Sequence, residues 1–146
     1  MSAPVRHAIS TEHERFWIAA QVAREGLACG LDSLRLAGLR IVVAELVSNA
    51  VRHAGGGVLT AGPIERGGRR GLEVIVEDEG PGITSITSAL RDGFSRGRVL
   101  TPDLPPAARQ SLGVGLGAVA RLTDELLIEP RSPSGTRIMV VLWSGL

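Results

Sequence analysis

Two predicted β-hairpins limit the folds that are open to this chain. Residues 58–65 and 72–78 read as strands, because the second alternates apolar and polar side chains and a glycine-rich turn separates the two. Residues 125–129 and 136–143 read as a second pair of strands around another turn. A short strand is also predicted at 5–9. Strands joined by short turns pair antiparallel, so we expect a mixed, mostly antiparallel sheet.

Three longer helices are predicted around these strands. Thr11 and Glu14 have the spacing of a capping box, which starts a first helix that stops at Gly30. A second helix covers 34–54 and ends in three consecutive glycines, and a third covers 113–122. Helices that cover one face of an antiparallel sheet form an α+β fold, here a two-layer α/β sandwich.

The segment between the two hairpins has the weakest pattern. A short helix is predicted at 85–91. Residues 93–112 combine glycines, three prolines and scattered arginines, which predicts a long loop. Loops of this length inside a compact domain usually have a function.

Composition excludes several classes of protein. Apolar residues make up 44% and the formal net charge is +1, which is ordinary for a globular domain and argues against binding to nucleic acid or to an acidic membrane surface. All 16 basic residues are arginines, so a phosphate-binding loop that requires lysine is excluded. The single cysteine, Cys29, indicates a reducing compartment. With no signal peptide and no membrane-length apolar run, the expected location is the cytoplasm.

The second helix carries an unusual polar pair. Glu45 and Asn49, the only asparagine, lie four residues apart and therefore share one edge of the apolar face. This pair has a structural explanation, two half-exposed residues beside a core stripe. It also has a functional one, which requires other chemical groups at the same edge.

Three other short patterns are each weak when taken alone. Asp78 ends a strand and is followed by Gly80 and Gly82, which is common at a strand–turn junction. Alternating glycines open the third helix, where free backbone N–H groups suit a phosphate, but a hinge would look the same. Thr136 enters the last strand from a turn.

Together, and in this order, the four patterns resemble the Bergerat ATP-binding fold shared by gyrase, the Hsp90 chaperones, histidine kinases and MutL. The phrases AELVSNAVRHAG and VEDEGPGI are similar to those of its small branch of anti-sigma factors and serine kinases, and most of all to the switch kinases of partner-switching stress pathways. The resemblance implies a single ATP-binding domain over residues 1–146, with ATP and Mg²⁺ as cofactors.

The resemblance also implies roles for individual residues. Glu45 would be the general base, Asn49 would hold Mg²⁺, and Asp78 would accept a hydrogen bond from the adenine amine with support from Thr136. Gly80 and Gly82 would let the base approach closely. Backbone N–H groups of the third-helix segment would bind the phosphates; its residues are Gly113, Val114, Gly115, Leu116 and Gly117.

Residues 93–112 would then be the ATP lid. Its three arginines could each meet phosphate charge, and the sequence does not choose among Arg96, Arg98 and Arg109. The proline-rich stretch 101–106 is longer than the resemblance leads us to expect in a switch kinase.

The leading hypothesis is an ATP-dependent protein serine kinase of a bacterial stress-response pathway. The resemblance implies a STAS-domain antagonist as substrate, followed by a second partner such as a PP2C-type phosphatase. One alternative is a nucleotide-gated anti-sigma factor that binds a sigma factor, with slow or secondary kinase activity. Another is an ATPase or sensor-kinase fragment that acts on no protein serine. The resemblance also allows a homodimer.

Overall fold

The protein is described by a computed structural model that covers residues 3–80, 99–100 and 113–145. The strands are β1 (Val5–Ile9), β2 (Gly57–Arg66), β3 (Arg69–Asp78), β4 (Val99–Leu100), β5 (Glu125–Pro130) and β6 (Thr136–Trp143). The helices are the short 3-10 helix η1 (Glu12–Glu14) and the α-helices α1 (Arg15–Ala28), α2 (Ser33–Ala54) and α5 (Gly113–Leu122).

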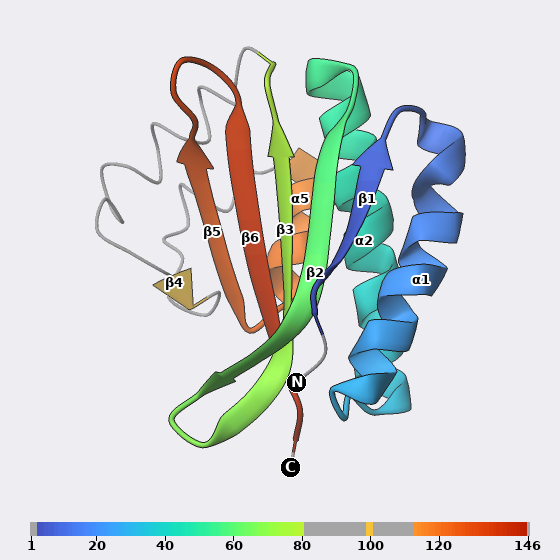
Figure 1. The fold of residues 1–146 in the computed structure, drawn as a ribbon, viewed down its shortest axis with the longest axis vertical. Coiled ribbons are helices and arrows are strands. Elements are labelled where there is room, and N and C mark those ends of the chain that lie inside the picture. The colour runs from blue at the N-terminus through green and yellow to red at the C-terminus, as the bar shows by residue number, and fades with distance from the viewer. Residues whose placement is uncertain (1–2, 81–98, 101–112, 146) are drawn as a thin grey trace.

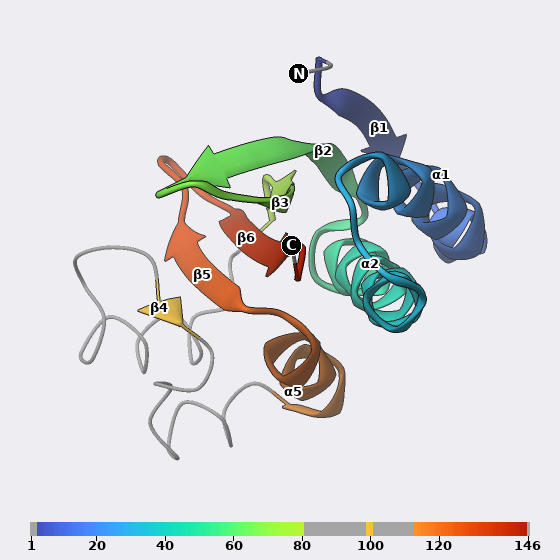
Figure 2. The ribbon, with the colours of Figure 1, turned by 90° about the horizontal axis from the view of Figure 1, so that it is seen from below.

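The described strands form one sheet in the order β1-β2-β3-β6-β5-β4. The three α-helices lie on one face of it, so the chain has two layers (Figures 1 and 2). This confirms the predicted α+β sandwich. Every pair among the described strands is antiparallel, whereas the prediction allowed a mixed sheet.

The element bounds agree closely with those expected from the sequence. The capping box at Thr11 and Glu14 is present, although it opens a 3-10 turn that leads into α1. The β2–β3 hairpin is longer than predicted, because both strands extend to the tight turn at Gly67 and Gly68. The strand β4 was not predicted. Its two residues, Val99 and Leu100, belong to the expected lid and pair with the start of β5. A strand of two residues is too short to produce a recognisable alternation in the sequence. The helix predicted at 85–91 lies outside the described residues.

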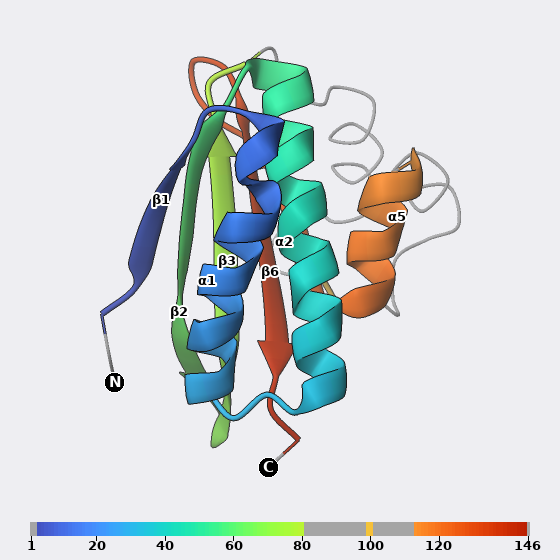
Figure 3. The ribbon, with the colours of Figure 1, turned by 90° about the vertical axis from the view of Figure 1, so that its right-hand side faces the viewer.

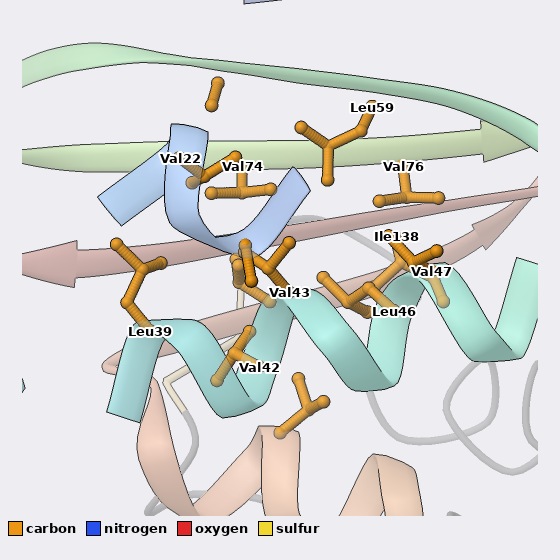
Figure 4. Packing of buried hydrophobic residues seen from close by; sticks show 14 of the residues in the cluster. Val22, Leu39, Val42, Val43, Leu46, Val47, Leu59, Val74, Val76 and Ile138 are labelled. Carbon is orange, nitrogen blue, oxygen red and sulfur yellow. The ribbon is translucent and has the colours of Figure 1, made fainter. Parts of the chain in front are cut away.

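The core lies between the sheet and the helices. α2 presents Leu39, Val43 and Leu46 to it, and side chains from β2, β3 and β6 face them (Figure 4). Because alternate residues of a strand point to opposite faces, Val74 and Val76 pack in this core and Asp78 points to the same side. The core thus fixes which side chains reach the end of the sheet next to α2.

Among the described residues, no helix is both long and apolar enough to cross a membrane.

Candidate functional site

Helix α2 carries the first part of the candidate site. Its start is fixed by Asp32, whose Oδ1 accepts a hydrogen bond from the Arg35 backbone N–H at 2.8 Å. Its end is fixed by Gly55, which has the left-handed conformation that suits glycine, with φ of 73°. With both ends fixed and the apolar face in the core, Glu45 and Asn49 come to the edge of the core as predicted.

Asn49 is buried without a protein partner. Only 4% of the residue is exposed, and within the described part of the chain its side chain makes no hydrogen bond. Among the described residues, the fully buried side-chain polar atom that has no partner is Nε2 of His7, so the amide atoms of Asn49 keep some contact with solvent. The Asn49 amide is therefore available to a ligand.

The predicted glycine segment lies directly against Glu45. A Cβ atom built on Gly115 would collide with Oε2 of Glu45, so the first turn of α5 contacts that carboxylate. A Cβ on Gly38 would lie 3.6 Å from Cδ2 of Leu122, at the far end of α5. These two contacts make α5 antiparallel to α2, in agreement with the packing of the two helices in Figure 3.

The same register places the start of α5 near Asn49. Because α5 is antiparallel to α2, residues before Gly115 lie beside α2 residues that follow Glu45. Both helices rise by about 1.5 Å per residue, so Gly113 lies nearer than Gly115 to the level of Asn49. The free N–H groups at the start of α5 thus face the edge that carries the polar pair. The side chain of Leu116 is 5% exposed and belongs to the core, so any contact of Leu116 with a ligand would come from its backbone.

Asp78 forms the second part of the candidate site. It is 4% exposed, and its Oδ1 accepts hydrogen bonds from the backbone N–H groups of Gly80 at 3.0 Å and Thr136 at 3.2 Å. Asp78 and Thr136 are opposite each other in the β3–β6 pair, as the predicted order of patterns requires. No hydrogen bond to Oδ2 is present in the described part of the chain, so that atom can accept one from a ligand.

The glycines near Asp78 have packing roles that the sequence did not reveal. A Cβ on Gly80 would lie 2.9 Å from the His53 carbonyl oxygen, so Gly80 lets the end of β3 touch the end of α2. Gly135, with φ of 113°, comes even closer to the Asp78 carbonyl oxygen, so a Cβ there would collide with it. This second contact was missed in the sequence analysis, although the Gly-Thr pair in the turn was its signal. Gly82 lies outside the described residues.

Two arginines near these residues were also not predicted. Arg131 donates a hydrogen bond through Nη1 to the Asp78 carbonyl oxygen at 2.8 Å, which holds the β5–β6 turn against the end of β3. Arg52 points its guanidinium at the glycine segment, with Nη2 lying 3.9 Å from the Cβ position of Gly115. Its spacing of three residues from Asn49 was the signal, because such residues share a helix face.

A cavity of about 510 Å³ opens on the other face of the sheet. Its lining includes Thr60 and Glu77, which alternate with the core residues Leu59 and Val76 and so point away from the helices. Neither Glu45 nor Asn49 lines it. Asp78 does line it, together with Ala54 and Gly55 at the end of α2, so the cavity adjoins the second part of the candidate site.

The donors at the candidate site suit a nucleotide with Mg²⁺. No group of three or more His, Cys, Asp or Glu side chains that could hold a metal ion gathers in the described part of the chain. A hard cation that keeps phosphate oxygens and waters in its shell needs few protein ligands, and oxygen is the preferred type. The unpartnered Asn49 amide fits this requirement, and the free Asp78 oxygen fits an amine donor on a base.

Comparison with known proteins defines the class to which this arrangement belongs. Residues 9–142 match the histidine kinase-like ATPase domain family, and the chain therefore belongs to that family. Within it, the chain is similar to the serine/threonine-protein kinase RsbT of Bacillus subtilis (strain 168), with 31% identity over 126 residues, 86% of this chain and 84% of RsbT. The expected superfamily and its small anti-sigma and serine-kinase branch are confirmed.

Proposed function

We propose that this protein is an ATP-dependent protein serine kinase of a cytoplasmic partner-switching pathway. The observation that carries the proposal is the meeting of Glu45, the unpartnered Asn49 amide and the start of α5 at one edge. The likeness to a serine/threonine-protein kinase over 86% of the chain supports an ATP-dependent kinase as the class of enzyme.

In this proposal each residue contacts a different part of the nucleotide. Oδ2 of Asp78 accepts a hydrogen bond from the adenine amine, while Oδ1 stays bound to the backbone of Thr136. Backbone N–H groups at the start of α5 donate to phosphate oxygens, where the helix dipole favours negative charge. The Asn49 carbonyl oxygen holds Mg²⁺. When bound, Mg-ATP supplies the phosphoryl group and a metal that offsets its charge.

Glu45 acts on the protein substrate. Its carboxylate takes the proton of a serine hydroxyl as the serine oxygen bonds to the γ-phosphorus and the bond from that phosphorus to the bridging oxygen of ADP breaks. A base must lie within hydrogen-bond reach of the hydroxyl. The Glu45 carboxylate is free to do so, because no hydrogen bond or ion pair holds it in the described part of the chain.

The proposed substrate is a STAS-domain antagonist, and the proposed next partner is a PP2C-type phosphatase. Both follow from the resemblance to switch kinases, in which phosphorylation of one partner releases the kinase to another.

The test is transfer of labelled γ-phosphate from Mg-ATP to STAS-domain proteins of the same organism. We expect label on a serine, lost on metal removal and reduced by roughly 10²- to 10⁴-fold in Glu45→Gln, the usual contribution of a general base. Glu65→Gln is the matched control, because Glu65 is an exposed glutamate on β2.

Three results would change this assignment. Undiminished transfer by Glu45→Gln would remove the base role from Glu45. Binding of Mg-ATP without any transfer would favour the nucleotide-gated anti-sigma factor, and binding to a sigma factor would then be measured. Failure to bind Mg-ATP would reject the proposed function as a whole.

A further inference from the structure

The turn between β5 and β6 holds the main chain of β3 at the point where that strand ends. Asp78 is the last residue of β3, and its pairing with Thr136 is the last one in the β3–β6 register. The Asp78 carbonyl oxygen accepts a hydrogen bond from Nη1 of Arg131 at 2.8 Å. The next carbonyl oxygen, that of Glu79, accepts one from Oγ of Ser134 at 3.2 Å. Side chains of the turn thus supply the hydrogen bonds that a strand partner no longer provides.

Arg131 is itself fixed in place. Its backbone N–H donates to the carbonyl oxygen of Gly135 at 3.1 Å, which closes the turn. Its Nε lies 3.5 Å from Oε2 of Glu77, the residue before Asp78. The guanidinium therefore contacts two consecutive residues of β3, one through a carboxylate and the other through a main-chain carbonyl oxygen. A planar guanidinium, with its N–H donors in fixed directions, is suited to hold two such acceptors at once.

The position of this main chain determines where the Asp78 carboxylate lies. Oδ1 of Asp78 accepts hydrogen bonds from the backbone N–H groups of Gly80 at 3.0 Å and Thr136 at 3.2 Å. One of these donors, Gly80, directly follows Glu79, whose carbonyl oxygen is bound by the turn. A shift of residues 78–80 would therefore move the donor to Oδ1 and, with the carboxylate group, also Oδ2.

We propose that Arg131 is a positioning residue for recognition of the adenine base and acts through Asp78. The inference deepens the proposed function and rests on it, because it takes Oδ2 of Asp78 as the acceptor for the adenine amine. With the Arg131 guanidinium on the Asp78 carbonyl oxygen, Oδ2 is held where the amine donates. Without that bond, residues 78–80 shift and the hydrogen bond to the base weakens, since its strength depends steeply on distance and angle.

A role in the stability of the turn alone makes a different prediction. The Arg131 side chain is 33% exposed, and its contact with Glu77 spans 3.5 Å, so this ion pair adds little to the free energy of unfolding. If Arg131 only stabilised the turn, its removal would lower the melting temperature and leave the discrimination between nucleotides unchanged.

The experiment compares two nucleotides by calorimetry: Mg-ATP, and the Mg²⁺ complex of purine riboside triphosphate, which lacks the amine. We expect the wild type to bind the second about tenfold to hundredfold more weakly, as for loss of a hydrogen bond to a carboxylate. In Arg131→Met, Mg-ATP should bind about threefold to thirtyfold more weakly, because that hydrogen bond is lost in part. The affinity for the analogue should stay at the wild-type value, so the preference for ATP shrinks.

Two further variants and a rate sharpen the result. Arg131→Lys should recover part of the preference for ATP, since it keeps the charge without the planar fork. Ser134→Ala removes the other side-chain bond from the turn to this segment and should reduce the preference in the same direction by a smaller factor. In Arg131→Met, phosphotransfer at saturating Mg-ATP should stay close to the wild-type rate while the KM for ATP rises, because Glu45 is not displaced.

Arg137→Met is the matched control, with the same change of charge and shape in the next strand. The Arg137 side chain is 30% exposed, and its Nε lies 3.8 Å from the same Glu77 oxygen that Arg131 approaches. Its hydrogen bond goes to Oε1 of Glu129 at 2.8 Å and not to the main chain of β3. We expect both nucleotide affinities in Arg137→Met to equal those of the wild type.

Three outcomes overturn the inference while the kinase assignment survives. An unchanged preference for ATP in Arg131→Met, with or without a lower melting temperature, would leave Arg131 only its role in the turn. Equal weakening of both nucleotides would mean that the turn shapes the site as a whole and not the contact with the amine. Equal affinity of the wild type for both nucleotides would remove the amine contact from Asp78. Failure of the wild type itself to bind Mg-ATP would instead reject the proposed function, and the inference with it.

Discussion

Two polar clusters lie at opposite ends of the molecule, and they differ in how their groups are paired. The paired cluster consists of Arg66, Glu125 and Trp143: Glu125 Oε2 lies 2.7 Å from Arg66 Nη1 and accepts a hydrogen bond from Trp143 Nε1 at 3.1 Å. The open cluster consists of Glu45, Asn49 and Arg52, and within the described residues none of its side chains forms a hydrogen bond or an ion pair.

Burial alone does not explain this difference. Glu125 is 3% exposed and Asn49 is 4% exposed, so both residues are largely buried. Glu125 has protein partners, whereas the Asn49 side chain has none among the described residues. A paired group such as Glu125 holds strands together, because its partners Arg66 and Trp143 lie on β2 and β6 while Glu125 itself lies on β5. An unpaired group such as the Asn49 amide keeps its hydrogen-bonding capacity for a ligand.

The two clusters are also far apart. β3 begins beside the paired cluster and ends at Asp78 at the opposite end of the sheet, and its ten residues span about 30 Å. Substitutions in one cluster should therefore leave the other unaffected.

Gly115→Ala should give the largest effect, on activity and not on stability. The new Cβ would occupy the place of the Glu45 carboxylate, which can swing away at little cost because no hydrogen bond or ion pair within the described residues holds it. Alanine also favours a helix over glycine by up to about 1 kcal/mol. We expect phosphotransfer to fall by roughly 100-fold, as for a catalytic group displaced by about 1 Å, with an unchanged or higher melting temperature.

Gly117→Ala is the control for that substitution. Among the described residues, its Cβ would meet Nη1 of Arg121, at 3.4 Å, the end of a flexible side chain. Phosphotransfer in Gly117→Ala should stay close to the wild-type rate. Equal rates in the two variants would mean that the contact between Gly115 and Glu45 does not position the base.

Glu125→Ala and Glu45→Ala should separate the clusters by stability. Removal of Glu125 leaves the buried Trp143 N–H without its acceptor, for a loss of about 1–3 kcal/mol in the free energy of unfolding. Arg66 adds little to this loss, because its side chain is 46% exposed and can be hydrated. Removal of Glu45 breaks no such bond within the part of the chain that the structure describes, so we expect a change of less than about 0.5 kcal/mol.

Urea denaturation followed by circular dichroism measures both values, and nucleotide affinity is measured in parallel. Glu125→Ala should bind Mg-ATP like the wild type. A large loss of stability in Glu45→Ala would show that the open cluster is held by interactions within the protein, and would contradict the comparison.

Much of the fold and part of the candidate site could be predicted from the sequence because their signals are local. The alternation in β3, the glycines after α2 and the four-residue spacing of Glu45 and Asn49 each depend on a few neighbouring residues. The convergence of Arg52 on Gly115 depends on how α5 docks against α2, and no periodicity reports that. The Arg66–Glu125 pair joins residues 59 positions apart, and either residue alone reads as an ordinary charge. The roles assigned to Asp78, Thr136 and the glycines remain predictions.

Glu14 offers an intermediate case and the smallest expected effect. It is an exposed carboxylate, but its Oε1 accepts hydrogen bonds from the backbone N–H groups of Thr11 at 2.7 Å and Ser10 at 2.8 Å, which lower the pKa of its carboxyl group. A carboxylate whose pKa is lower in the folded than in the unfolded protein stabilises the fold above its unfolded pKa, and this contribution is lost as the pH falls through the folded value. Glu14→Gln should therefore melt slightly below the wild type at pH 7, and the difference should shrink as the pH falls below the ordinary glutamate pKa of about 4.3. Melting curves across this range, with Glu12→Gln as control from the same 3-10 helix, measure the effect. A difference that stays constant with pH would mean that the carboxylate charge contributes nothing, and that pairing matters only where the group is buried.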